Sequence, residues 1–93
     1  METRINIRVL LVDDHPLVRQ TLTTILKQHP NIEVVGEAGD GDEAVMSVEL
    51  LRPAVVVMDI NMQKMDGVTA ARLIKKQYPQ VAIVGLSADP CHA

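Results

Sequence analysis

The chain alternates between short apolar runs and longer segments in which apolar residues recur at helical spacing. Four runs have the composition of strands: Ile7–Val12, Ile32–Gly36, Ala54–Met58 and Val81–Leu86. A continuous apolar run is typical of a parallel strand that is buried on both faces. Three helices are predicted between these runs, over Pro16–Gln28, Gly41–Arg52 and Val68–Gln77.

The first predicted helix has the clearest apolar face, because Val18, Leu22, Ile25 and Leu26 recur at intervals of three and four residues. The second helix begins after Asp40, with Glu43 three residues later, a pair that resembles a capping box. The third helix has a weaker stripe formed by Ala71, Leu73 and Ile74.

Strands and helices therefore alternate from the first strand to the last. This order predicts a parallel sheet with helices on both faces, joined by right-handed crossovers. The 93 residues suit one domain with one core. The segment after Leu86 is too short for another crossover helix, so we expect the sheet to stop at four strands.

Composition excludes several classes of function. Tyr78 is the only aromatic residue and the net charge is −3, which argues against binding nucleic acid by base stacking or by a basic surface. Cys91 is the only cysteine, so a disulfide framework is excluded and a reducing cytoplasm is the expected setting. No apolar run approaches the length of a membrane span, and no membrane partner is expected.

Three aspartates follow or end two of the predicted strands. Asp13 and Asp14 follow the first strand, and Asp59 follows the third. Ligands of open α/β sheets bind beyond the carboxyl ends of such strands, so the three carboxylates are predicted to form one acidic pocket. At an effective dielectric constant of about 20, each pair of charges 4 Å apart costs roughly 4 kcal/mol. At neutral pH such a pocket needs either a hard cation with oxygen ligands or carboxyl groups that stay protonated.

Each of these residues also has a simpler interpretation. Asp13 and Asp14 could favour the positive end of the following helix, and Asp59 could be a solvated loop residue. The coincidence of an adjacent pair with a third aspartate at another strand end favours the pocket. Asp66-Gly67 is a turn signal in the loop after Asp59, and Ser87 at the end of the fourth strand is usually a turn or cap residue.

Taken together, these residues resemble the receiver domain of two-component response regulators, which has a CheY-like, flavodoxin-like fold. The resemblance covers the whole chain and rests on Leu11–Pro16 (LVDDHP), Val34–Gly41 (VVGEAGDG), Asp59–Met62 (DINM), Met65–Gly67 (MDG) and Leu86–Ala88 (LSA). The first two segments resemble the subfamily whose members carry a LuxR-type helix-turn-helix output domain. The fold implied is a doubly wound parallel sheet in strand order 2-1-3-4, truncated to about four strands and three helices.

The resemblance implies a phosphorylation site at Asp59, which would take a phosphoryl group from a sensor histidine kinase or a small phosphodonor. Asp14 and Asp59 would bind Mg²⁺ directly, together with the backbone carbonyl of Asn61, and Asp13 would act through a metal-bound water. These roles agree with the chemistry, because phosphoryl transfer needs in-line positioning and neutralised oxygen charge.

The resemblance also implies a switch. Ser87 would be the hydroxyl that turns toward the phosphoryl group, and Ala88 would leave room beside it. DNA would be contacted only through an output domain outside this chain, and the full-length protein would control transcription. The chain itself is expected to be a signalling domain and not an enzyme.

Two departures from the family are visible. Gln63 stands where the family usually has proline, which is expected to loosen the loop after Asp59. The family's last helix-strand-helix segment is absent from residues 1–93, and with it the lysine that pairs with the phosphoryl group, since no lysine follows Lys76. We therefore expect an incomplete receiver domain that is phosphorylated weakly or not at all.

The missing segment has a predicted packing consequence. The fourth strand would become an open edge, and apolar side chains of the first and third strands would be partly uncovered. A homo-oligomer formed through this edge and face is therefore expected.

Three other functions compete with the phosphoacceptor. An interaction module that keeps the fold without switching is the main alternative. An aspartyl phosphatase of the haloacid dehalogenase type would need Asp-x-Asp after the first strand, where this chain has Asp13-Asp14 followed by His15. A nucleotide-phosphate site is disfavoured because no glycine-rich loop follows the first strand.

Overall fold

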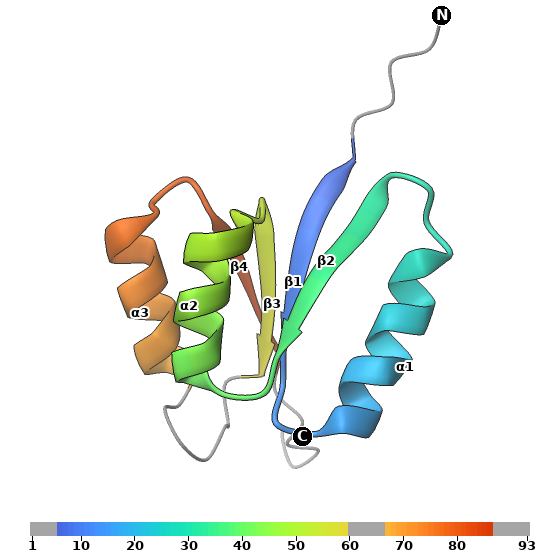
Figure 1. The fold of residues 1–93 in the computed structure, drawn as a ribbon, viewed down its shortest axis with the longest axis horizontal. Helices are drawn as coiled ribbons and strands as arrows, with labels where there is room; N and C mark the ends of the chain where they lie inside the picture. The colour runs from blue at the N-terminus through green and yellow to red at the C-terminus, as the bar shows by residue number, and fades with distance from the viewer. Residues whose placement is uncertain (1–5, 60–66, 87–93) are drawn as a thin grey trace, which may run out of the picture.

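Four parallel strands alternate with three helices over the part of the chain that the computed structural model describes, residues 6–59 and 67–86. The elements are β1 (Ile7–Val12), α1 (Pro16–Lys27), β2 (Ile32–Ala38), α2 (Gly41–Leu51), β3 (Val55–Asp59), α3 (Gly67–Gln77) and β4 (Ala82–Leu86), as Figure 1 shows. Within these ranges the predicted α/β, flavodoxin-like architecture is confirmed, and the predicted element boundaries are wrong by at most two residues.

The strands lie in the order β2-β1-β3-β4, which is the predicted order. The largest boundary error is at β2, which continues past Gly36 because Glu37 and Ala38 pair with the last two residues of β1. Backbone pairing, and not apolar side chains, extends the strand there. The β1–β2 register also shifts between Val9 and Leu10, which marks an irregularity in the ladder.

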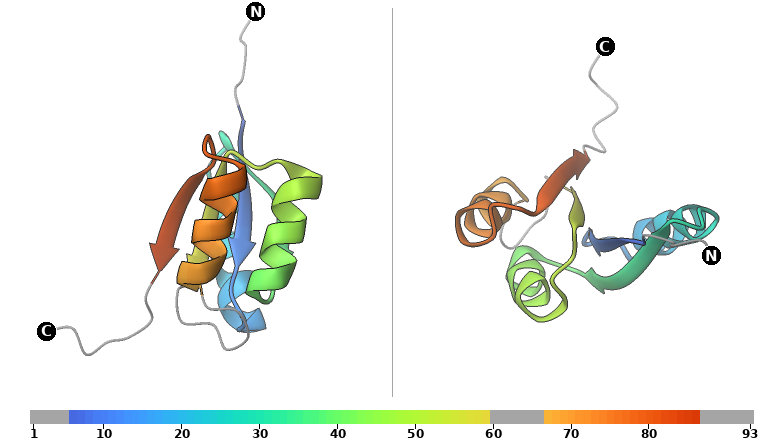
Figure 2. Two further views of the ribbon diagram at one scale, coloured as in Figure 1. Left: turned by 90° about the vertical axis from the view of Figure 1, so that its left-hand side faces the viewer. Right: turned by 90° about the horizontal axis from the view of Figure 1, so that it is seen from above.

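The main core lies between the sheet and the helices α2 and α3, which cover one face together (Figure 2). The side chains of Leu10, Val12, Val56 and Met58 alternate onto this face. They pack against small and β-branched residues of the two helices, namely Ala44, Val48, Ala70 and Ile74. One residue of the predicted α3 stripe is wrong: Leu73 is exposed, and Ala70 is buried in the core instead.

The opposite face carries α1, which packs against β1 and β2. Val9 and Leu11 are buried there, so the prediction that β1 would be partly uncovered is wrong for these two side chains. Farther along this face, Val57 of β3 is half-buried and Val84 of β4 is 47% exposed. The uncovered part of the sheet is therefore the β3–β4 half, beside the β4 edge.

The apolar face of α1 is only partly covered. None of its residues is buried, and Ile25 remains 48% exposed. The periodicity of this helix predicts correctly that it is amphipathic. The face is only partly covered because α1 meets the sheet without a second helix beside it among the described residues.

Two helix ends are fixed by local contacts. The Asp40 side chain accepts a hydrogen bond from the backbone N–H of Glu43 at 2.8 Å, which confirms the predicted cap of α2. At the other end of α2, Arg52 adopts a left-handed conformation with φ of 51°. Its guanidinium lies 4.8 Å from the ring centroid of Tyr78, a cation–π contact that joins α2 to the α3–β4 connection.

None of the helices within the described ranges is long and apolar enough to cross a membrane.

Candidate functional site: an acidic cluster at the carboxyl end of the sheet

The carboxyl ends of β1 and β3 bring three aspartates together. These two strands are neighbours in the sheet, with Val12 paired to Met58, so the residues that follow this pair on the two strands lie side by side. Asp13 and Asp59 are almost fully buried, at 6% and 3% exposed, and Asp14 lies at the rim. The three carboxylates that the sequence predicts to gather at this edge of the sheet therefore do so.

His15 completes the cluster. One potential ligand atom from each of Asp13, Asp14, His15 and Asp59 lies within 4.8 Å of the others. The backbone N–H of His15 donates a hydrogen bond to Asp13 Oδ1 at 2.8 Å, and the ring Nδ1 lies 3.1 Å from the same oxygen. The one sequence signal for these contacts is that His15 directly follows the aspartate pair.

The carboxylates act on the charge of His15. Its pKa is raised above the ordinary value of 6.5, first by the hydrogen bond to Asp13 and then by the negative charge of Asp14. The protonated imidazole thus offsets part of the repulsion within the cluster.

The capping interpretation of the two adjacent aspartates is not what the structure has. The residue at the N-cap of α1 is His15, and no side chain caps this helix end. Asp14 Oδ1 is buried and lacks a hydrogen-bond partner among the described residues, although it lies 2.8 Å from His15 Nδ1. Because Nδ1 is hydrogen bonded to Asp13, the contact with Asp14 is an ion-pair contact. A buried carboxylate oxygen that makes an ion-pair contact but no hydrogen bond fits a cation site.

Arg19 supports the cluster from the first helix, and the sequence analysis missed it. Its Nη1 donates a hydrogen bond to the backbone carbonyl of Asp13, and its Nε donates to Glu37 Oε1 at 3.1 Å. The guanidinium thus ties the end of β1 to the end of β2. The only sequence signal is a cation one turn after His15 together with an acid at the end of the next strand.

Several predicted site residues cannot be placed. Asn61, Gln63, Ser87 and Ala88 lie outside the described residues. The nearest described position is Leu86, which precedes Ser87 and pairs with Asp59 in the β3–β4 ladder.

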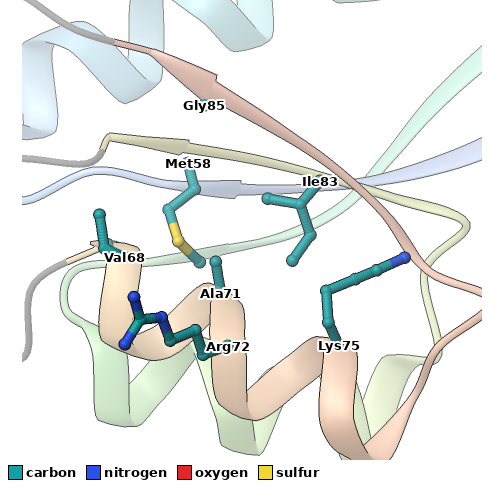
Figure 3. A pocket seen from close by; sticks show the side chains of 8 residues that line it. Met58, Val68, Ala71, Arg72, Lys75, Ile83 and Gly85 are labelled. Atoms are coloured by element: carbon teal, nitrogen blue, oxygen red, sulfur yellow. The ribbon is translucent and has the colours of Figure 1, made fainter.

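A separate pocket of about 480 Å³ lies between α3 and the strands β3 and β4 (Figure 3). Its walls are apolar, with Met58, Ala71 and Ile83 facing it, and Arg72 and Lys75 stand at its border. Lys75 Nζ donates hydrogen bonds to the backbone carbonyls of Pro79 and Val81 at 2.8 Å, so it holds the α3–β4 connection. The pocket contains no carboxylate among its lining residues, and it is distinct from the acidic cluster.

Comparison with known proteins agrees with this geometry. The model of the response regulator receiver domain matches residues 9–91. The chain is 48% identical over 73 residues to a protein-glutamate methylesterase/protein-glutamine glutaminase of Alkalilimnicola ehrlichii, covering 78% of this chain and 19% of that protein. It is 43% identical over 81 residues to the transcriptional regulatory protein DegU of Brevibacillus brevis, covering 87% of this chain and 34% of that protein.

A solved structure is similar throughout the fold. The response regulator domain of Thermotoga maritima CheB superposes with a TM-score of 0.85 at 41% identity, over 89% of this chain and 61% of that chain. The chain thus spans about a fifth to a third of the two curated relatives named above, and less than two thirds of the solved domain.

Proposed function

The chain belongs to the family of response regulator receiver domains, and from that premise we propose that Asp59 accepts a phosphoryl group from a sensor histidine kinase or a small phosphodonor. An oxygen of the Asp59 carboxylate attacks phosphorus, the bond from phosphorus to the donor breaks, and an acyl phosphate forms. The observation that carries this proposal is the position of Asp59 at the end of a central strand, 3% exposed and within the cluster of Asp13, Asp14 and His15.

The cofactor we propose is Mg²⁺. Asp14 and Asp59 are proposed as direct ligands, Asp13 as a ligand through water, and the backbone carbonyl of Asn61 as a further ligand. Asp14 Oδ1 supports this assignment, because it is buried and makes an ion-pair contact with His15 but no hydrogen bond within residues 6–59 and 67–86. When bound, Mg²⁺ supplies charge neutralisation for the phosphoryl oxygens.

The protein's own groups prepare the carboxylates. Arg19 holds the backbone of Asp13 in place, and His15 holds the Asp13 side chain by two hydrogen bonds. Lys75 lies at the far end of α3, where its Nζ donates hydrogen bonds to the backbone carbonyls of Pro79 and Val81. Ser87 and Ala88 keep their proposed roles as switch hydroxyl and small neighbour.

The two curated relatives have different printed functions, one a transcriptional regulatory protein and the other a methylesterase/glutaminase. The segment they share with this chain is the receiver, so receiving the phosphoryl group is the role proposed here. Control of transcription remains a proposal for a longer protein with a DNA-binding output domain. The cytoplasmic setting likewise remains a prediction.

The test is phosphorylation in vitro. The folded chain is incubated with Mg²⁺ and acetyl phosphate or phosphoramidate, and its intact mass is measured beside Asp59→Asn and Asp42→Asn. Asp42 is an exposed carboxylate in the first turn of α2 and serves as the matched control. We expect a labile adduct that Asp59→Asn abolishes and Asp42→Asn retains. An adduct that persists in Asp59→Asn contradicts the proposal.

A second candidate is an interaction module that keeps the fold without switching. The partly uncovered β3–β4 half-face beside the β4 edge favours it, with Val84 as its most exposed apolar strand residue. The occupant we propose is a second copy of the chain. Light scattering at tens of micromolar is expected to give a mass above the monomer, and Val84→Lys is expected to lower it. A monomeric mass for the unaltered chain contradicts self-association.

A further inference from the structure

His15 is the one member of the acidic cluster that carries no oxygen ligand. Its side chain is 66% exposed, yet the ring is oriented inward, because its backbone N–H and its Nδ1 both contact Asp13 Oδ1. The ring nitrogen thus lies among the carboxylates and not out in solvent.

The spacing of these atoms matches a metal coordination shell. Nδ1 lies 3.1 Å from Asp13 Oδ1 and 2.8 Å from Asp14 Oδ1. Ligands on adjacent corners of an octahedron with bonds of roughly 2.1 Å lie about 3 Å apart. The largest separation in the cluster, up to 4.8 Å, needs only a small contraction to match opposite corners.

We propose that His15 is a ligand for first-row transition cations and that it shifts the selectivity of the pocket away from Mg²⁺. Imidazole nitrogen suits ions such as Co²⁺ and Ni²⁺, whereas carboxylate and water suit Mg²⁺. Mg²⁺ would bind the oxygens of Asp14 and Asp59, and the imidazole of His15 would not be one of its ligands. A transition cation takes the lone pair of a neutral Nδ1, with the proton carried on Nε2, toward solvent.

This inference rests on the proposed metal site, and the two can fail separately. A chain that binds Co²⁺ through His15 but takes no phosphoryl group contradicts the acceptor role of Asp59 and keeps the ligand role of His15. Loss of a His15-dependent preference for Co²⁺ concerns the ligand set and leaves the acceptor intact.

The test uses Co²⁺ alone as the probe, with Mg²⁺ titrated in parallel. Calorimetry gives both affinities for the unaltered chain, His15→Ala and His29→Ala. His29 is an exposed histidine beyond the end of α1 and controls for surface binding of Co²⁺. Far-ultraviolet circular dichroism verifies that each variant is folded. Both variants are expected to fold, because both histidine side chains are exposed.

We expect His15→Ala to weaken Co²⁺ binding by at least about tenfold. Removing a residue that only hydrogen bonds to a metal ligand already costs about that much in metal affinity, so removing a ligand should cost no less. Mg²⁺ affinity should change much less than Co²⁺ affinity, because His15→Ala keeps the backbone N–H that donates to Asp13 Oδ1 and removes only the imidazole, and His29→Ala should change neither. Proton NMR with Co²⁺ should give large paramagnetic shifts for the ring of His15 alone. Unchanged Co²⁺ affinity in His15→Ala, or equal losses for Co²⁺ and Mg²⁺, overturns the proposal.

Discussion

Replacing Asp14 by asparagine tests whether the acidic cluster stores repulsion in the metal-free protein. The substitution removes one negative charge and keeps the shape of the side chain. It also costs little in hydrogen bonding, because Asp14 Oδ1 has no hydrogen-bond partner among the described residues. We expect Asp14→Asn to be more stable than the unaltered chain without metal and to lose the stabilisation by Mg²⁺.

The magnitude follows from the geometry. Two carboxylates 4.8 Å apart, the largest separation within the cluster, repel by about 3.5 kcal/mol at an effective dielectric constant of 20, and Asp14 faces two such partners. Two effects reduce the gain from removing this repulsion: the Asp14 side chain is 22% exposed, and the variant loses its contact with His15. A net gain of about 1 kcal/mol remains, which raises the Tm of a domain of this size by about 4–8 °C.

The assay is thermal unfolding with and without Mg²⁺ in mildly alkaline buffer, where less of His15 is protonated. At a Mg²⁺ concentration one hundred times the Kd, the unaltered chain should gain about 2.7 kcal/mol, and Asp14→Asn should gain much less. Asp42→Asn is the control, with an expected loss of about 0.3–1 kcal/mol because Asp42 favours the helix dipole of α2. A lower Tm for metal-free Asp14→Asn, or undiminished stabilisation by Mg²⁺, refutes the reasoning.

Three further predictions concern neighbouring features. Arg19→Ala should lower the free energy of unfolding by about 1–2 kcal/mol, because the Asp13 carbonyl loses its charged donor. Glu37→Gln should lower it by less than about 1 kcal/mol, since the ion pair between Arg19 and Glu37 is partly exposed. Urea denaturation measures both, and equal losses of stability would contradict this ranking. The pKa of His15 is raised in the folded protein, so its protonation stabilises the fold fully at a pH below the unfolded pKa of 6.5, and this stabilisation disappears as the pH rises through the folded pKa. NMR titration of His15 should give a midpoint above 6.5 that Mg²⁺ lowers. A midpoint that does not respond to Mg²⁺ would count against the metal site. Gly36→Ala would place a Cβ 2.6 Å from Cδ1 of Leu51, which is the movable end of a half-buried side chain. The net loss of stability should be below about 1 kcal/mol, because alanine restricts the backbone of the unfolded strand more than glycine does and so offsets part of the steric cost. Gly36→Val should lose about 1–3 kcal/mol, and equal urea midpoints for the two variants would contradict this account.

The strands and the acidic cluster could be predicted because both depend on local patterns. Apolar runs such as Val9–Val12 mark buried parallel strands, and the carboxyl ends of parallel strands meet at one edge of the sheet. Asp13 and Asp59, which are distant in sequence, are therefore brought together by topology alone. The end of β2 was missed because Glu37 is held by backbone pairing, which leaves no mark in hydropathy.

Contacts between distant side chains could not be predicted in the same way. The salt bridge between Arg19 and Glu37 joins a helix to a strand end, and either residue alone looks like an ordinary surface charge. Helical periodicity shows that Val18 and Ile25 share a face of α1, but it does not show how much of that face another layer covers. Burial of an amphipathic face is a property of the assembled layers.

The contact between Tyr78 and Arg52 has a practical consequence for spectroscopy. Tyr78 is the only aromatic residue of the chain, so all of its intrinsic fluorescence comes from one ring. Tyr78 belongs to the connection between α3 and β4, and this connection lies at the opposite end of the sheet from the carboxyl ends of β1 and β3 (Figure 1). A cation or phosphoryl group at Asp59 cannot quench Tyr78 by contact. Any change in emission on adding either would therefore be a direct optical record of a rearrangement carried along the length of the domain.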